Sequence, residues 1–286
     1  MDPALIDGYL RRLGTERPGR PTADVLRELH LRHLRTVPFE NLSLHLGEEI
    51  VLAEERLLEK IVDRRRGGFC YELNGAFAVL LRALGFEVAL LAARTYGKEG
   101  LLGVPYDHLA LRVGTADGGD WLADVGFGAH SHGPLAIGER GEQRDPGGVF
   151  RVTEAGADAA DVRGPGGPAG SEDLVVLCDG TPQYRLELRP RALGDFRIGA
   201  WWHGTSPDSH FGRSLVCSRL TGQGGRITLG GRRLTLTAPD GEKEAVDLTS
   251  DAEVLEVYRE RFGIALDRVP EVRERSVVRE RAGTNL

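Results

Sequence analysis

The run Arg66-Gly67-Gly68-Phe69-Cys70-Tyr71-Glu72-Leu73-Asn74-Gly75 carries the strongest signal in this 286-residue chain, because it places a cysteine where an amphipathic helix begins. Apolar residues at positions 73, 77, 80, 81 and 84 have the spacing of a buried helical face. Unpaired N–H groups and the helix dipole favour a thiolate at such a position. The two glycines have no Cβ, so we expect a substrate to approach the sulfur closely. The run is typical of a nucleophile, although a free cysteine is also often a buried core residue.

A predicted hairpin supplies a base for this cysteine and an acid to orient that base. Residues 108–113 and 121–125 have the pattern of strands, and a glycine-rich turn joins them. If the hairpin folds about Ala116, His108 lies directly opposite Asp124 on one face. A slip of one residue would turn Asp124 to the other face, so the interpretation depends on the register.

Cys70, His108 and Asp124 then have the order nucleophile, base and orienting acid. The expected resting state is a thiolate–imidazolium pair, with the cysteine pKa well below its free value of roughly 8.5. Each residue also has an ordinary structural interpretation: a core cysteine, a strand histidine and a turn-capping aspartate.

The chain resembles the arylamine N-acetyltransferases over nearly its whole length. The similarity is most specific in several segments that occur in the family's order and at compatible spacing. These are Val37-Pro38-Phe39-Glu40-Asn41-Leu42, residues 65–75 around Cys70, the strands with His108 and Asp124, residues 206–211, and the hairpin at Gly230-Gly231.

The resemblance implies an α+β fold of several domains with a papain-like Cys-His-Asp core. Residues 1–85 would form a helical bundle that ends in the cysteine helix. Residues 86–195 would form an antiparallel β-barrel carrying His108 and Asp124, and residues 196–286 an α/β lid. The patterning agrees with this order: it predicts helices at 23–35, 53–64 and 252–262, and strands at 87–94, 108–113, 121–125, 174–177, 184–189, 226–229 and 233–236.

The resemblance also implies a ping-pong reaction. Acetyl-CoA would acylate Cys70, CoA would leave, and an arylamine, arylhydrazine or N-hydroxyarylamine would take the acetyl group with His108 as base. Acetyl-CoA is then a substrate, and neither a permanently bound cofactor nor a metal is expected. The implied pocket for the acceptor and the acyl-CoA contains Phe39, Phe127, Gly128 and Phe211. Glu40, Asn41 and Arg66 are interpreted as structural support for the cysteine loop.

Three alternatives remain open at this point. Amide synthases that close ansamycin-type macrolactams share these motifs, but they take the acyl group from a carrier-bound polyketide and form an aryl amide within one molecule. Transglutaminase-like and other papain-like hydrolases share the Cys-His-Asp order but not the other segments. A binding module without catalysis is the third class.

Composition limits the other function classes. A net charge of −6 and a pI near 5.8 argue against nucleic acid as a main partner. We expect neither a signal peptide nor a membrane span. Three widely spaced cysteines favour cytoplasmic thiols over disulfides or a zinc site. The Arg-, Ala- and Gly-rich composition suggests an actinobacterial source, and residues 155–170 are predicted to form a turn-rich loop.

Overall fold

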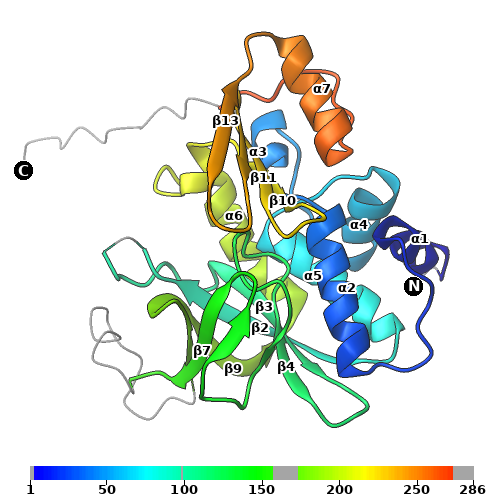
Figure 1. Cartoon of the computed structure of the whole chain (residues 1–286), viewed down its shortest axis with the longest axis vertical. Coiled ribbons are helices and arrows are strands. Elements are labelled where there is room, and N and C mark those ends of the chain that lie inside the picture. Colours follow the sequence, from blue (N-terminus) through cyan, green and yellow to red (C-terminus); the bar gives the residue numbers. More distant parts are fainter. Residues whose placement is uncertain (1–2, 98, 157–172, 273–286) are drawn as a thin grey trace, which may run out of the picture.

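The computed structural model describes residues 3–97, 99–156 and 173–272. Helices from the first third of the chain pack beside a curved β-sheet, and a second sheet with its own helix lies above them (Figure 1). The predicted loop at 155–170 lies almost wholly outside the described residues. Within the described residues, no helix has both the length and the apolar character needed to cross a bilayer.

The helices are α1 Pro3–Leu13, α2 Ala23–Thr36, α3 Leu42–Leu46, α4 Glu54–Leu58 with a π-helical turn Glu59–Asp63, α5 Cys70–Ala83, α6 Arg197–Thr205 and α7 Asp251–Phe262, with 3-10 turns at Leu193–Phe196 and His210–Gly212. The strands are β1 Phe39–Glu40, β2 Glu87–Thr95, β3 His108–Gly114, β4 Asp120–Ala123, β5 Leu135–Ala136, β6 Gln143–Asp145, β7 Gly148–Glu154, β8 Leu174–Cys178, β9 Thr181–Arg191, β10 Cys217–Leu220, β11 Arg226–Gly230, β12 Arg233–Thr237 and β13 Lys243–Asp247. The predicted helices and strands are therefore confirmed, with small shifts at their ends.

Helix α5 lies at the centre of the main hydrophobic core and begins at Cys70, as the sequence predicts. Every residue from Cys70 to Leu81 is buried, because α1, α2 and α4 pack on one side and β2 and β3 on the other. The carboxylate of Glu72 accepts the N–H of Phe69 at 3.3 Å and so satisfies a donor at the helix start. The cysteine is thus held on a rigid, buried element.

The larger sheet is an antiparallel, barrel-like sheet of eight strands in the order β5-β4-β3-β2-β9-β8-β7-β6. Its two edge strands do not pair through their backbones. The side-chain amide of Gln143 bridges them instead, because it donates to Ala136 O at 3.0 Å and accepts Ala136 N–H at 2.7 Å. The barrel interior is apolar, and β3 is buried on both faces because its outer face packs on α5.

The register of the β3–β4 hairpin differs from the prediction. Leu111 pairs with Ala123 and Val113 with Trp121, so the turn is centred on position 117 rather than on Ala116. Composition alone did not locate the turn, which is closed by the bond from Thr115 N to the carbonyl of residue 119 at 2.9 Å. A shift of two residues leaves every side chain on its predicted face.

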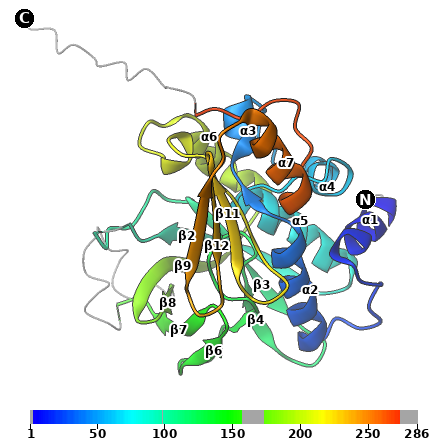
Figure 2. The same ribbon diagram turned by 45° about the horizontal axis from the view of Figure 1, so that its top comes forward.

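The smaller sheet has the order β1-β10-β11-β12-β13, so it combines one short strand from the first part of the chain with strands from the last part. Figure 2 shows its later strands standing beside α7, which covers one face. Strand β1 pairs with β10 through Phe39 and Ser218, and Glu40 N donates to Gly68 O at 2.8 Å. The cysteine loop is therefore tied to this sheet, although the sequence-based division assigned the two to different domains.

Gly67 is required for a reason other than the predicted access of substrate. A Cβ at this position would lie 1.8 Å from the carbonyl oxygen of Pro38, so the protein's own backbone fills the space. At Gly68, a Cβ would meet the side chain of Glu72 at 2.6 Å. Both glycines therefore allow the cysteine loop to pack closely against β1 and α5.

We expect Gly67→Ala to reduce the free energy of unfolding by about 3 kcal/mol, because a rigid backbone atom has to move. Urea unfolding followed by circular dichroism measures this change. The matched control is Gly138→Ala, where nothing lies within 4 Å of the added Cβ. Equal stability of both variants would show that the loop is not packed in this way.

Candidate active site

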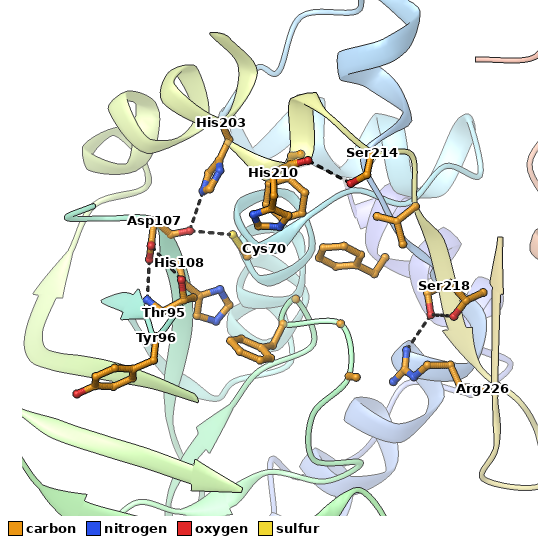
Figure 3. Close-up of a pocket in the computed structure, with 18 residues that line it drawn as sticks. Cys70, Thr95, Tyr96, Asp107, His108, His203, His210, Ser214, Ser218 and Arg226 are labelled. Atoms are coloured by element: carbon orange, nitrogen blue, oxygen red, sulfur yellow. Dashed lines mark hydrogen bonds between the residues drawn. The ribbon is translucent and has the colours of Figure 1, made fainter. Parts of the chain in front are cut away.

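A cavity of about 560 Å³ lies where the helical part, the barrel and the smaller sheet meet (Figure 3). Its walls are mostly apolar, and Cys70 and His108 lie at one side. The residues that line it are Phe39, Cys70, Thr95, Tyr96, Asp107, His108, Gly126, Phe127, Gly128, Ala129, His203, His210, Phe211, Ser214, Val216, Ser218, Arg226 and Thr228.

Cys70, the first residue of α5, is only 3% exposed. Its side chain interacts with His108, and its sulfur lies 3.9 Å from the carbonyl oxygen of Asp107. Burial raises the pKa of the thiol above its usual value, although His108 acts to lower it. The predicted lowering of the Cys70 pKa is therefore wrong as a net direction, because the sequence reveals the helix start but not the depth of burial.

His108 and Asp124 form a short, buried pair. His108 Nε2 lies 2.6 Å from Asp124 Oδ2, which leaves Nδ1 for the side of Cys70. Burial alone would lower the pKa of His108, but the Asp124 carboxylate raises it to about 10. The imidazolium lowers the pKa of Asp124 well below its usual value despite the burial of that carboxyl group. The Asp124 carboxylate therefore stabilises the imidazolium form of His108, which is the partner that a Cys70 thiolate requires.

Three residues that the sequence analysis did not select hold Asp124 in place. Asn74 Nδ2 donates to Asp124 Oδ1 at 2.8 Å, and the N–H of Gly126 donates to the same oxygen at 3.0 Å. The backbone N–H of Asp124 donates to His30 Nε2 at 3.3 Å, and His30 Nδ1 contacts the carbonyl of His132 at 3.0 Å. Asn74 was detectable, since it lies one helical turn after Cys70. His30 could not be identified from the sequence, because the residues that it contacts are distant in the chain.

Aromatic rings enclose the pair and the cavity. Phe127 and Tyr184 each lie 5.2 Å from the His108 ring, between centroids. On the other wall, Phe39 and Phe211 lie 6.0 Å apart. All of the predicted pocket residues, Phe39, Phe127, Gly128 and Phe211, border the cavity. Their contact with a substrate stays a prediction.

Polar groups near the sulfur include Asp107 and His203, which the sequence analysis did not select. Asp107 accepts Thr95 N–H and Thr95 Oγ1–H at 2.9 and 3.0 Å, and burial raises its pKa to about 6. His203 Nε2 lies 3.0 Å from the carbonyl oxygen of Asp107, which also faces Cys70. Asp107 could have been selected from the sequence, because it directly precedes His108. His203 could not, because it belongs to no motif.

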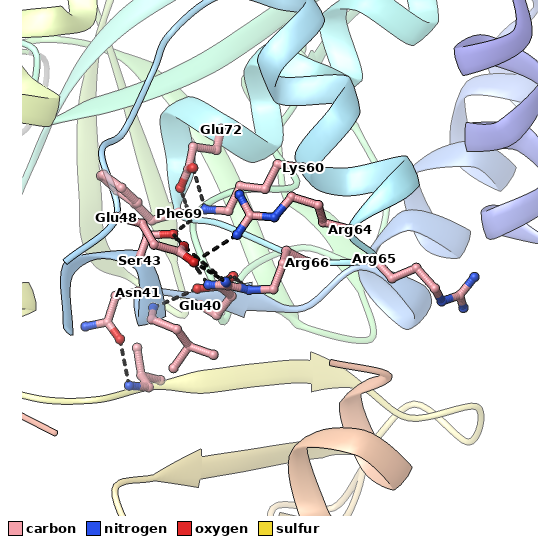
Figure 4. A network of polar contacts seen from close by, with 12 residues as sticks. Glu40, Asn41, Ser43, Glu48, Lys60, Arg64, Arg65, Arg66, Phe69 and Glu72 are labelled. Atoms are coloured by element: carbon pink, nitrogen blue, oxygen red, sulfur yellow. Dashed lines mark hydrogen bonds and ion pairs between the residues drawn. The ribbon is translucent and has the colours of Figure 1, made fainter. Parts of the chain in front are cut away.

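A network of charged side chains lies beneath the cysteine loop (Figure 4). Arg66 contacts Glu40 at 2.9 Å and Glu48 at 3.1 Å, and Lys60 contacts Glu72 at 2.6 Å. Burial alone would raise the pKa of Glu40, but the positive charges of Arg66 and Lys60 hold it below its usual value. Each buried charge thus has a partner of opposite sign.

Asn41 joins this region to the smaller sheet. Its Nδ2 donates to Phe211 O at 3.0 Å and to Ser214 O at 2.6 Å, and its Oδ1 accepts Val216 N–H at 2.9 Å. The side chain therefore fixes the backbone that carries one aromatic wall of the cavity. These contacts agree with the structural interpretation of Glu40, Asn41 and Arg66.

We expect Arg66→Met to lower the free energy of unfolding by about 3–5 kcal/mol, because it leaves the buried carboxylate of Glu40 without its main partner. Urea unfolding measures the loss. The matched control is Arg65→Met at the exposed neighbour, which points away from the network (Figure 4). Adding Glu40→Leu to the Arg66 variant should restore part of the stability, and no restoration would contradict the charge argument.

Among the described residues, no group of three or more His, Cys, Asp or Glu side chains is arranged to hold a metal ion. All three cysteines of the chain are free thiols, and Cys70 is the one that borders the cavity. The arrangement offers a nucleophile, a proton carrier and a fixed acid in an apolar cavity. Such a set suits acyl transfer through a thioester.

Comparisons with known proteins agree with this geometry. A family model described as N-acetyltransferase matches residues 22–271. An arylamine N-acetyltransferase of Mycolicibacterium smegmatis is 35% identical over 270 residues, which cover 91% of this chain and 92% of the relative. The solved arylamine N-acetyltransferase from Salmonella typhimurium superposes with a TM-score of 0.81 at 31% identity, covering 94% of each chain. The solved arylamine N-acetyltransferase from Mycobacterium marinum in complex with CoA superposes with a TM-score of 0.77 at 31% identity. This match covers 91% of this chain and 92% of that chain.

The similarity extends over most of the chain and of each relative, so it includes the helices, both sheets and the cavity between them. The chain is therefore a member of the arylamine N-acetyltransferase family of enzymes.

Proposed function

We propose that this enzyme transfers an acetyl group from acetyl-CoA, through a thioester on Cys70, to an arylamine, arylhydrazine or N-hydroxyarylamine. The observation that carries the proposal is the placement of Cys70, His108 and Asp124 at one side of an aromatic cavity, from three different elements. Family membership supplies the substrate classes, and the CoA complex of the Mycobacterium marinum relative supports CoA as the donor.

The first half-reaction begins when His108 takes the proton of the Cys70 thiol. The Asp124 carboxylate stabilises the imidazolium that results, so a thiolate then faces an imidazolium. The thiolate attacks the carbonyl carbon of the acetyl group, and the bond from that carbon to the CoA sulfur breaks. His108 gives its proton to the departing CoA sulfur, so the products are free CoA, acetyl-Cys70 and a neutral imidazole.

The second half-reaction uses that neutral imidazole as the base. The acceptor amine attacks the thioester carbonyl, and His108 takes a proton from its nitrogen as the bond to sulfur breaks. The products are the acetylated amine and the original thiolate–imidazolium pair. The apolar walls at Phe39, Phe127 and Phe211 would limit hydrolysis of the thioester by excluding water.

In this proposal the three parts of the chain have separate tasks. Residues 1–85 supply the helical bundle with the nucleophile, residues 86–195 the barrel with the proton carrier, and residues 196–286 a lid over a papain-like core. Residues of the last part also line the cavity, which supports the assignment of 196–286 as a lid. These are His203, His210, Phe211 and Arg226. The enzyme would use only small-molecule substrates, with CoA as a substrate and not a resident cofactor. A cytoplasmic location stays a prediction from its cysteines.

Brief mixing of the intact protein with acetyl-CoA, without an amine, tests the proposal by mass spectrometry. We expect one added acetyl group in the wild type and none in Cys70→Ala, because the sulfur carries the group. A simple arylamine such as aniline should then remove it. No adduct in a folded protein whose Cys70 still reacts with iodoacetamide would contradict the choice of donor. A carrier-bound polyketide, the donor of the macrolactam amide synthases, would be the next to try.

The pH dependence of cysteine alkylation tests the role of His108. Burial raises the pKa of Cys70 and His108 lowers it, so His108→Ala leaves burial unopposed and moves the thiolate to higher pH. We expect the iodoacetamide rate at pH 7 to fall at least about tenfold, since one pKa unit is a tenfold change in the thiolate fraction. The variant should approach the wild-type rate as the pH rises. An unchanged rate at pH 7 would show that His108 does not act on the sulfur.

A further inference from the structure

His203 lines the cavity but takes no part in the reaction steps described above. It belongs to α6, is 4% exposed, and lies among aromatic rings, of which that of Phe211 is 4.9 Å away between centroids. Both of its ring nitrogens have a hydrogen-bond partner. Nε2 lies 3.0 Å from Asp107 O, and Nδ1 lies 3.2 Å from Ser209 Oγ. These contacts fix the orientation of the ring.

The same partners determine which nitrogen carries the hydrogen. A carbonyl oxygen can only accept a hydrogen bond, so Nε2–H donates to Asp107 O. Nδ1 then has no hydrogen and accepts the hydroxyl of Ser209. Burial lowers the pKa of His203 to about 4, with help from His210 and His108 and against the Asp107 bond. The imidazole is therefore neutral near pH 7 and keeps one tautomer.

The carbonyl of Asp107 also faces the reacting sulfur (Figure 3). It lies 3.9 Å from Cys70 Sγ, close enough for a long S–H···O contact while the thiol is protonated. The thiolate and the acetyl thioester have no S–H, so in both states this oxygen loses the sulfur as a donor. A buried carbonyl oxygen without a donor costs free energy, and its partial negative charge repels a thiolate.

We propose that His203 is a positioning residue for this reaction, which keeps the Asp107 carbonyl hydrogen-bonded whenever Cys70 is a thiolate or a thioester. This inference rests on the proposed function. The Nε2–H offsets part of the negative charge on the oxygen, so it reduces the repulsion of the thiolate. Ser209 supports the same tautomer throughout, because its contact does not involve the sulfur. His203 neither gains nor loses a proton, and His108 remains the base.

Other groups act on the sulfur directly. Burial raises the pKa of Cys70 and the Asp124 carboxylate adds to this, whereas His108 and the backbone of Leu109 lower it. The effect of His203 is additional to theirs, because it acts through a carbonyl group and carries no charge. Removal of its N–H should therefore move the thiolate to higher pH and leave the reactivity of the fully ionised sulfur unchanged.

The experiment compares two amide variants of the intact protein by the pH dependence of Cys70 alkylation with iodoacetamide. The amide nitrogen of Gln can take the place of a histidine Nε2, whereas the shorter Asn reaches only the place of Nδ1. In His203→Asn we expect the rate at pH 7 to fall roughly 3- to 10-fold, as for loss of one hydrogen bond, and to approach the wild-type rate at high pH. His203→Gln should stay within about twofold of the wild type at every pH.

The control is Trp201→Leu, on the same helix, where the side chain is 66% exposed. It should leave the pH profile unchanged. His203→Leu is a second variant without the donor, for which we expect the same loss as in His203→Asn. Circular dichroism verifies that each variant is folded.

An unchanged profile in the folded variants without the donor would overturn the proposal. So would equal losses in the Asn and Gln variants, or a loss that persists at high pH, because His203 would then only shape the cavity. Alkylation needs no acyl donor, so these outcomes do not depend on the proposed function. That function fails separately, if the wild type takes no acetyl group from acetyl-CoA.

Discussion

The burial of one carboxylate constrains the rest of the site. Asp124 is 2% exposed, and a charge so far from water is stable only where hydrogen-bond donors replace the solvent. Those donors come from His108 on β3, Asn74 on α5 and Gly126 in the following loop, while His30 on α2 holds the Asp124 N–H. A displacement of α2, α5 or β3 would leave the charge unsatisfied. The same contacts set the distance between the acid and the imidazole beside Cys70.

A second group of buried charges serves the other side of the cysteine. Arg66 and Lys60 neutralise Glu40 and Glu72, and these carboxylates in turn accept backbone N–H groups at the starts of α3 and α5. The loop before Cys70 is therefore fixed from below by ion pairs and from the side by its close approach to β1.

The sequence predicted what depends on local pattern. The periodicity of α5, the alternation of β3 and β4 and the order of the motifs were sufficient to bring Cys70, His108 and Asp124 together. The two-residue error in the hairpin was harmless because strand faces repeat every two residues. What depends on packing was not predictable: the upward shift of the Cys70 pKa comes from burial, and His30 contacts segments that are distant in the chain.

The pairing of β1 with the smaller sheet has a consequence for how the protein is made. The bond between Asn41 and Val216 joins residues 175 positions apart, and β1 has no other strand beside it until β10 exists. At about 5–20 residues per second, a ribosome needs roughly 10–35 s to cover that distance. During this time the nascent chain can fold α5 and the barrel, but strand β10, which pairs with Phe39, has not yet been synthesised. The cavity is thus completed only after the barrel has been synthesised, and until then a growing chain holds its thiol without a finished site around it.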